Sequence, residues 1–461
     1  MAEKVLVAVA VGVTNDMNKK VKDTITKTNK KINLKASLSL AASALLGTSV
    51  VTAPVSHAKD ADEWQFDSAF LVYSEVDRVS ATEAIIAGTK TFDNDEVLSL
   101  KLTVDALTGA SANGAIAQPM AQTFTRPSGN GQYVTPAGET PLDDTFKDTR
   151  VQLNAQWAQP LSDNITGSVG GHLSKEYDYL SLGVNGNLAY DFNRNNSTIS
   201  IGLSYFQDTF TPEGGIPKPL SSMLIGDSSA PDWDAEFAKT RIGDSDDKST
   251  ADILVGFTQV INRRMITAFN YSYSMVDGYL TDPFKVISVI NFDGIAQDYI
   301  YENRPDSRVK QSTFMQTKYH FDESLLNTVA DISYRYMWDD WDITSHTIDT
   351  RFTIPVGRAS YIEPHIRFYQ QGAADFYQPY IIDDQKSVDF VSADYRIGEM
   401  TAVTVGAKYG VVLNGGNELS FRIEYYRQMP TDAGFVDPNG LNGLDKYPVV
   451  EAVIAQVSYS F

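Results

Sequence analysis

The sequence predicts an all-β fold, a transmembrane antiparallel β-barrel of about 16 strands with short periplasmic turns and long extracellular loops. Segments of ten to fifteen residues alternate apolar and polar side chains with a period of two. A strand that faces two different solvents has this period. The connections between the segments alternate between short and long, and the chain opens with a segment typical of an export signal.

Residues 1–58 are predicted to be a signal peptide, and residues 59–461 a single outer-membrane β-barrel domain. A strongly basic stretch, 17–35, precedes an apolar run that is interrupted by Ser and Thr. Cleavage after Ala58 fits the small Ser56 two positions earlier. The sixteen residues before Met17 fit poorly in front of such a signal, so Met17 is a candidate for the true start.

The composition excludes several classes of function. The chain has 461 residues, a formal net charge of −20 and no cysteine. Without cysteine there is no disulfide, no thiolate metal site and no lipid-anchored N-terminal Cys. We expect no nucleic-acid partner, because an acidic surface repels phosphate. Since the basic signal segment offsets part of the charge, the exported chain is more acidic than the whole.

The alternation is clearest in five internal segments and at the C-terminus. In 97–107, for example, Leu100 and Leu102 share one face while Lys101 and Asp105 share the other. A soluble sandwich hides its apolar face, whereas a membrane barrel turns that face to lipid and adds aromatic girdles. The segments carry many Tyr and Trp, which favours the barrel; a secreted all-β protein such as a sandwich is the alternative. The other segments are 150–160, 266–275, 328–338, 418–426 and 449–461.

The connections fall into two groups by length. An even strand count places both termini at the periplasmic end, where bacterial barrels have their short turns. The expected short turns are 92–95, 161–164, 193–196, 261–264, 322–325, 355–358 and 414–417, and the expected long loops are 111–144, 210–247, 280–306, 375–399 and 429–448.

The polar faces place charged side chains of both signs inside the barrel. We interpret mixed Arg and carboxylate rows as a network that rigidifies the wall, because such groups pair in a low-dielectric interior. A charged constriction of a diffusion pore is the functional alternative. The lumen-lining residues of the prediction are Lys101, Asp105, Arg150, Asp331, Arg335, Asp349, Arg351, Glu363, Arg367, Arg422 and Glu424, with Lys408 on the same face.

Sequence spacing identifies no catalytic residues. His172 and His365 fall on inward faces, but no serine or acidic partner is indicated by position. We therefore expect no enzymatic activity; the alternative is an outer-membrane hydrolase that uses a lumenal or rim histidine. No resident cofactor is expected.

Three acidic clusters suggest hard oxygen ligands for calcium or magnesium, but none completes a twelve-residue calcium loop. They are either solvated loops or sites that bind a divalent cation or bridge lipopolysaccharide. The clusters are Asp232, Asp234 and Glu236; Asp244, Asp246 and Asp247; and Asp339, Asp340 and Asp342.

Several stretches resemble a proteobacterial family catalogued only as a domain of unknown function and regarded as an outer-membrane barrel. The resemblance implies that the protein is encoded near a small periplasmic lipoprotein and a flavin-attaching enzyme. This in turn implies a trans-envelope redox or export assembly with the barrel as its shell. It implies no catalytic residues. The stretches are 278–285 (GYLTDPFK), 302–308 (ENRPDSR), 334–347, 371–377 and 392–410 (SADYRIGEMTAVTVGAKYG).

The C-terminal strand resembles the signal read by the barrel-assembly machinery of Gram-negative bacteria. Its features are the terminal aromatic Phe461, Tyr459 two positions earlier, and apolar residues at alternate positions before them. We expect a non-enzymatic protein of the Gram-negative outer membrane, either a pore or the shell of a complex. Its expected partners are outer-membrane lipid, lipopolysaccharide, the assembly machinery and the periplasmic lipoprotein.

Deletion of Phe461 is predicted to impair membrane insertion before it affects transport, because the terminal aromatic would be the address for assembly. The measurement is the amount of protein in the outer-membrane fraction, compared with the full chain. Normal insertion of the truncated protein would count against this interpretation.

Overall fold

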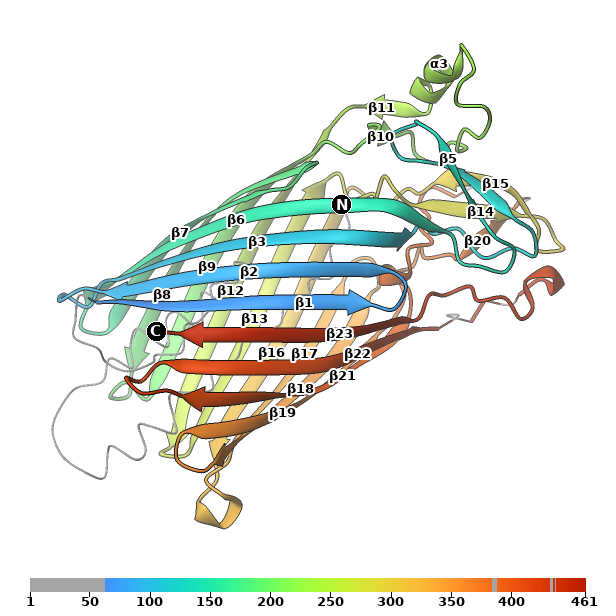
Figure 1. Cartoon of the computed structure of the whole chain (residues 1–461). Coiled ribbons are helices and arrows are strands. Elements are labelled where there is room, and N and C mark those ends of the chain that lie inside the picture. Colours follow the sequence, from blue (N-terminus) through green and yellow to red (C-terminus); the bar gives the residue numbers. More distant parts are fainter. Residues whose placement is uncertain (1–62, 384–387, 432–433, 436) are drawn as a thin grey trace.

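The computed structural model describes residues 63–383, 388–431, 434–435 and 437–461. The proposed signal peptide and its cleavage site lie outside the described residues. Sixteen antiparallel strands form a closed barrel, which confirms the predicted fold class and strand number (Figure 1). In the described part of the chain, no helix is long and apolar enough to cross a lipid bilayer.

Around the ring, each barrel strand pairs with the next in the order of the chain. The strands are β1 (Trp64–Glu75), β2 (Val79–Thr91), β3 (Val97–Ala112), β6 (Leu142–Ser162), β7 (Ile165–Lys175), β8 (Tyr179–Phe192), β9 (Ser197–Phe210), β12 (Asp246–Asn262), β13 (Met265–Gly278), β16 (Ser307–His320), β17 (Val329–Asp339), β18 (Thr344–Val356), β19 (Ser360–Gln371), β21 (Met400–Val412), β22 (Glu418–Pro430) and β23 (Val450–Ser460).

The barrel closes between its first and last strands. β1 and β23 pair antiparallel from Asp67 opposite Ser460 to Glu75 opposite Ala452. Beyond this ladder, the amide and carbonyl groups of Phe66 and Phe461 exchange hydrogen bonds of 2.9 and 2.8 Å. Closure leaves no unpaired strand edge, which a sheet in lipid cannot tolerate because the bilayer core offers no hydrogen-bond partners.

The apolar face of each strand points outward. Along β3, Leu100, Leu102 and Val104 are 39 to 40% exposed, whereas the intervening Lys101 and Thr103 are 8% and 3% exposed. The exterior is therefore a band of aliphatic and aromatic side chains suited to lipid, and the polar residues line the interior.

Aromatic rings gather near the end of the barrel at which β1 begins and β23 ends. Phe66 stacks on Trp64 and on Phe461, and Phe461 stacks on Tyr459. On the same rim, Tyr190 stacks on Phe192. Rings at this height form the girdle that anchors a barrel at the membrane interface.

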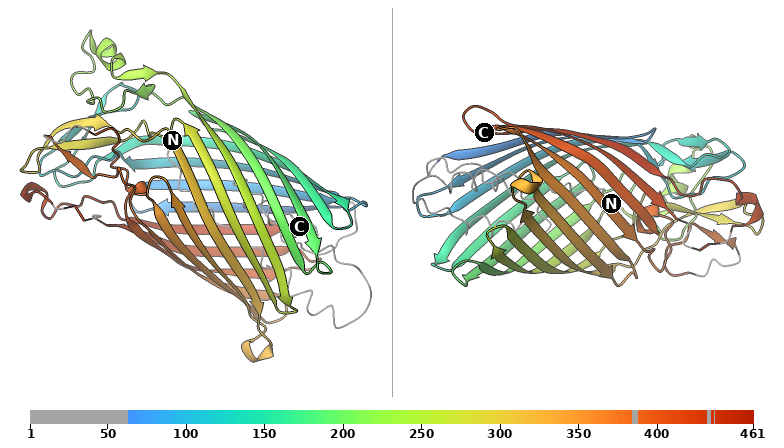
Figure 2. Two further views of the ribbon diagram at one scale, coloured as in Figure 1. Left: turned by 180° about the vertical axis from the view of Figure 1, so that it is seen from behind. Right: turned by 90° about the horizontal axis from the view of Figure 1, so that it is seen from below.

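The two ends of the barrel differ in the length of their connections, as predicted (Figure 2). Seven short turns lie at the periplasmic end, including η1 (Glu323–Leu325). Three connections at the outer end are also short: 76–78, 176–178 and 340–343.

The five long outer loops contain the remaining elements. These are β4 (Gln122–Thr125), β5 (Gln132–Thr135), β10 (Ile216–Pro217), α3 (Trp233–Ala238), β11 (Arg241–Gly243), β14 (Val286–Ile290), β15 (Ala296–Tyr301), β20 (Tyr380–Ile382), η3 (Tyr395–Ile397) and η4 (Asn439–Leu441).

Candidate functional site

The five long loops fold together at the outer mouth, and we call this layer the cap. Its centre is the hairpin of β14 and β15 (Figure 1). On one side β20 pairs with β14 in parallel. On the other side, the amide groups of Leu220 and Met223 donate to the carbonyl oxygens of Tyr301 and Tyr299 at 3.1 and 2.7 Å. Strand pairing thus joins three different loops into one sheet region.

The remaining two loops also bind this hairpin. From the β3–β6 loop, Ile116 N donates to Ser288 Oγ at 3.1 Å, and Asn113 O accepts from Val286 N at 2.8 Å. From the β22–β23 loop, Gly440 N donates to Asp293 O at 2.9 Å. All five long loops therefore meet at a single element.

The ring order shows that this meeting point bridges the mouth. The β9–β12 loop rises from the seventh and eighth strands of the ring, and the β22–β23 loop from the fifteenth and sixteenth. These roots lie on opposite sides of a ring of sixteen strands. Because both loops contact the β14–β15 hairpin, the cap must extend across the opening between them.

Apolar side chains hold the cap together. One cluster joins Ile287, Val289 and Ile300 of the hairpin to Ile381 and Val391 of the β19–β21 loop. A second cluster joins Ile290 to Ile116, Tyr380 and Leu441, which come from three further loops. Burial of such a side chain stabilises by about 1.5–3 kcal/mol relative to exposure, so the cap has a hydrophobic core of its own.

A buried network of charged side chains ties the base of the cap together. Glu302, Asp394 and Asp282 have side chains that are 0, 1 and 3% exposed. Arg304 contacts Glu302 at 2.6 Å and Asp394 at 2.8 Å. Arg396 contacts Asp394 at 2.5 Å and Asp282 at 2.6 Å. The network links the β13–β16 loop to the β19–β21 loop across the β17–β18 turn.

The arginines of the network stabilise the ionised forms of Asp282 and Asp394, whereas burial raises the pKa of Glu302. Burial alone would raise the pKa of Asp282, but Arg396 and Lys285 more than offset it and hold the pKa at about 2. Burial is likewise outweighed at Asp394, whose pKa lies well below its usual range because of Arg396 and Arg304. Removal of one partner would leave a buried uncompensated charge, which is strongly destabilising.

Sequence reasoning missed this network, because period-two patterning carries no information about loop packing. Its members nevertheless lie in the stretches that support the family resemblance. Asp282 and Lys285 belong to GYLTDPFK, Glu302 and Arg304 to ENRPDSR, and Asp394 to SADYRIGEM. Charged residues of both signs within these loop stretches were the available signal.

On the inner wall, the structure places the lumen-facing residues of the sequence analysis on the polar faces of their strands. Several form ion pairs between neighbouring strands. Arg150 Nε lies 2.6 Å from Asp105, and Lys318 Nζ lies 3.2 Å from Asp331. On a single strand, Arg351 lies 3.4 Å from Asp349. Glu363 accepts a hydrogen bond of 2.8 Å from a threonine hydroxyl.

His365 forms a bridge between two carboxylates of the wall. Its Nε2 lies 3.1 Å from Asp349 of β18, and its Nδ1 lies 2.8 Å from Glu424 of β22. Strand β21 runs between β19 and β22, and Gly406 is the register partner of both His365 and Glu424. A Cβ atom at position 406 would lie 2.5 Å from Glu424 Cγ. The absence of a side chain there lets the imidazole reach across a strand.

The histidine geometry does not resemble a hydrolytic site. Ionised carboxylates only accept hydrogen bonds, so the bridge suits a doubly protonated His365 and not a general base. His172 Nδ1 lies 2.8 Å from the Asn154 side chain, and His346 Nδ1 lies 2.8 Å from the Tyr334 hydroxyl. Within the described ranges, no serine or threonine hydroxyl is hydrogen-bonded to a histidine ring.

The three acidic clusters of the sequence analysis differ in their surroundings. In the third, Asp339 is not a solvated loop residue as expected. Its carboxylate is 0% exposed, contacts Arg308 at 2.5 Å and accepts from Ile343 N at 2.8 Å. In the first, Glu236 pairs with Lys239 at 2.5 Å. The second cluster, including Asp246 and Asp247, is exposed at the start of β12.

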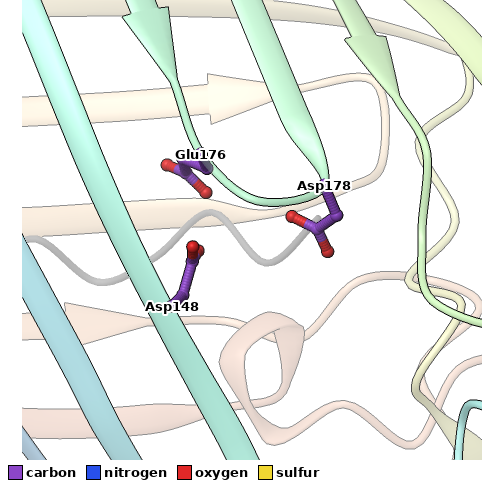
Figure 3. Close-up of side chains that lie close together, drawn as sticks. All are labelled: Asp148, Glu176 and Asp178. Carbon is purple, nitrogen blue, oxygen red and sulfur yellow. The ribbon is translucent and has the colours of Figure 1, made fainter.

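A different acidic group has ligand-like geometry. Asp148 of β6 and Glu176 and Asp178 of the β7–β8 turn bring carboxylate oxygens within 4.8 Å of one another (Figure 3). The sequence could not reveal this group. Its residues come together through the pairing of β6 with β7, which the local sequence pattern does not determine. Asp148 and Glu176 are buried and Asp178 is half-buried, and hard cations favour such oxygen sets.

The closed barrel, with its apolar exterior and polar inner wall, defines the class of protein. Only closed barrels and helices satisfy all backbone groups in lipid, and barrels of this build belong to outer membranes. The protein is an outer-membrane β-barrel of a Gram-negative bacterium. More particularly, the chain belongs to the family described as "Protein of unknown function (DUF3570)", whose model matches residues 35–461. This confirms the resemblance noted in the sequence.

Several solved structures have a similar arrangement. A bacterial polysaccharide outer membrane secretin is 9% identical with a TM-score of 0.42, covering 87% of this chain and 99% of that chain. CdiB from Acinetobacter baumannii is 7% identical (TM-score 0.42; 87% and 61% covered). BamA from Haemophilus ducreyi lacking POTRA domains 1-3 is 9% identical (TM-score 0.41; 87% and 71%). No curated protein matches significantly.

Replacement of Arg396 by Met is predicted to unfold the cap while leaving the barrel intact. The change leaves Asp394 and Asp282 with buried charges that lack a main partner, a loss on the order of 3–5 kcal/mol. Limited proteolysis of the detergent-solubilised protein should show faster cleavage in 279–306 and 388–399, with unchanged heat-modifiable migration.

The matched control is Arg126→Met, which removes a surface pair with Asp144 at 2.7 Å. Such exposed pairs contribute about 1 kcal/mol or less, so cleavage should match that of the unaltered protein. Equal cleavage of the Arg396 and Arg126 variants would show that the buried network does not hold the cap.

Proposed function

We propose that the protein is a non-enzymatic pore for small hydrophilic solutes, narrowed at its outer mouth by a permanently folded cap. One observation carries the proposal. Loops from opposite sides of the ring meet on the β14–β15 hairpin above a polar inner wall. Conduction of this kind needs no resident cofactor and no catalytic group.

The inner wall supports passage of polar solutes. A barrel of sixteen strands is wide enough for an aqueous channel. Its polar faces carry charges of both signs, and pairs such as Arg150 with Asp105 rigidify the wall without concentrating one sign. The proposal combines the two interpretations of the charged rows. Most of the wall is a network of ion pairs, and a charged constriction would lie where the charged side chains form no ion pair.

The folded state of the cap is evidence for a narrow opening at the outer mouth. It has its own apolar clusters and a buried ion network, so it differs from a set of independent mobile loops. Elements with buried apolar contacts and buried hydrogen bonds open rarely. Solute size would thus be limited at the outer end and not along the wall.

The second candidate is a membrane shell for a protein that enters from the periplasm. The asymmetry of the barrel favours it: the outer end is bridged, whereas among the described residues the periplasmic end carries only short turns. The small periplasmic lipoprotein implied by the family resemblance is the partner that we propose in this case. The outer-membrane lipid, lipopolysaccharide and the assembly machinery are proposed partners in both.

Planar-bilayer recordings of the purified full chain distinguish these candidates. A pore predicts stable conductance steps, and replacement of residues 286–301 by a Gly-Ser linker of equal length should increase the step size several-fold, because it removes the hub of the cap. Replacement of α3, which contributes no residue to the buried charge network, is the matched control and should leave the steps unchanged.

Two outcomes would contradict the pore. Silence of both the full chain and the linker variant would favour the plugged shell. Equal steps in both would show that the cap does not limit conduction. Hydrolysis of lipid or peptide that is abolished by His365→Ala would overturn the non-enzymatic assignment altogether.

A further inference from the structure

Two arginines of the inner wall form no ion pair with a described carboxylate. Arg335 on β17 and Arg367 on β19 both face the lumen, yet neither forms an ion pair or hydrogen bond with any described residue. The guanidinium carbon of Arg335 lies over the face of Phe314, 5.6 Å from the ring centroid. Most other arginines of the wall are paired, such as Arg422, which contacts Glu424 at 3.8 Å.

The carboxylate that could neutralise Arg367 is already occupied. Asp349 is its direct register partner on β18. However, the oxygens of Asp349 contact His365 Nε2 at 3.1 Å and Arg351 at 3.4 Å. The bridge across Gly406 fixes His365 from the other side, so the bond to Asp349 is held in place. Asp349 therefore attracts Arg367 electrostatically but forms no ion pair with it.

Arg335 and Arg367 stand on the lumen face of strands β17 and β19, on either side of β18. On β18, the partner of Arg335 is Thr347 and the partner of Arg367 is Asp349, two residues along the same face. The charges of the two arginines interact electrostatically. Two cations that repel each other in a confined lumen favour an anion between them.

The pair lies directly beneath the cap. Arg367 acts electrostatically on Tyr426, which packs in one apolar cluster with Tyr369 of the wall and Tyr395 of η3 in the cap. A solute that passes the cap would meet these arginines among the first charged groups of the wall.

We propose that Arg335 and Arg367 form a binding site for a small oxyanion, a phosphate or a carboxylate group, in the lumen beneath the cap. The guanidinium group presents a planar fork of donors that matches two oxygens of such an anion. As a specificity site, the pair deepens the proposed pore function and rests on it. Anion binding itself does not depend on conduction.

The test is calorimetric titration of the detergent-solubilised full chain with sodium phosphate, and separately with sodium acetate, at constant ionic strength. The unaltered protein should bind at least one of them, and the tighter one identifies the class of ligand. The double variant Arg335→Gln with Arg367→Gln should weaken that binding tenfold or more. The control is Arg358→Gln, an exposed arginine of the β18–β19 turn, which should bind as the unaltered protein does.

Three results would overturn the site: no binding of either anion, equal binding by the double variant, or equal loss in the Arg358 control. If the double variant fails to show heat-modifiable migration, Arg335→Lys and Arg367→Lys replace it. These keep the charge but lose the fork, and they should weaken binding measurably; unchanged affinity in both would count against the site.

Recordings in the bilayer separate this site from the pore. If phosphate binds but no conductance is seen, the pore fails and the anion site stands. If conductance is normal but neither anion binds, the site fails and the pore stands. If both hold, phosphate should reduce the chloride current at concentrations at least tenfold lower in the unaltered protein than in the double glutamine variant.

Discussion

The hydrogen bonds between β1 and β23 are the interaction on which the rest of the structure depends. In lipid, every backbone donor and acceptor of a strand must be paired within the protein, and this pairing closes the ring. Closure fixes which strands lie opposite each other. It therefore determines where the long loops are rooted, and why loops far apart in sequence, such as those around Met223 and Gly440, can meet above one opening.

The barrel could be predicted from the sequence because both of its signals are local. Alternation with period two shows which side chains face lipid, and the change between short and long connections shows the orientation. Leu100 and Lys101 illustrate the first signal, because Leu100 faces lipid and Lys101 faces the lumen. Phe461, at the end of the last strand, pairs with Phe66 of the first strand. Both follow from the chemistry of a strand between two solvents.

The cap could not be predicted in the same way. Its contacts join residues that are far apart, such as Arg396 with Asp282, 114 positions earlier, and they obey no period. The charged inner wall is an intermediate case. Its members could be read from alternation, but their pairing depends on register. Only the structure shows that Asp349 contacts His365 and Arg351, and that Arg367, its register partner, forms no ion pair with it.

The folded cap bridges the mouth of the barrel, and a distance measurement between two of its loops can test this. Because the chain has no cysteine, spin labels can be attached to Phe292→Cys in the β14–β15 turn and Asn442→Cys in the β22–β23 loop without a background. Their loops are rooted six strands apart in the ring. Dipolar spectroscopy should give one narrow distribution at the short end of its range, whereas a broad distribution reaching the width of the barrel would contradict the bridge.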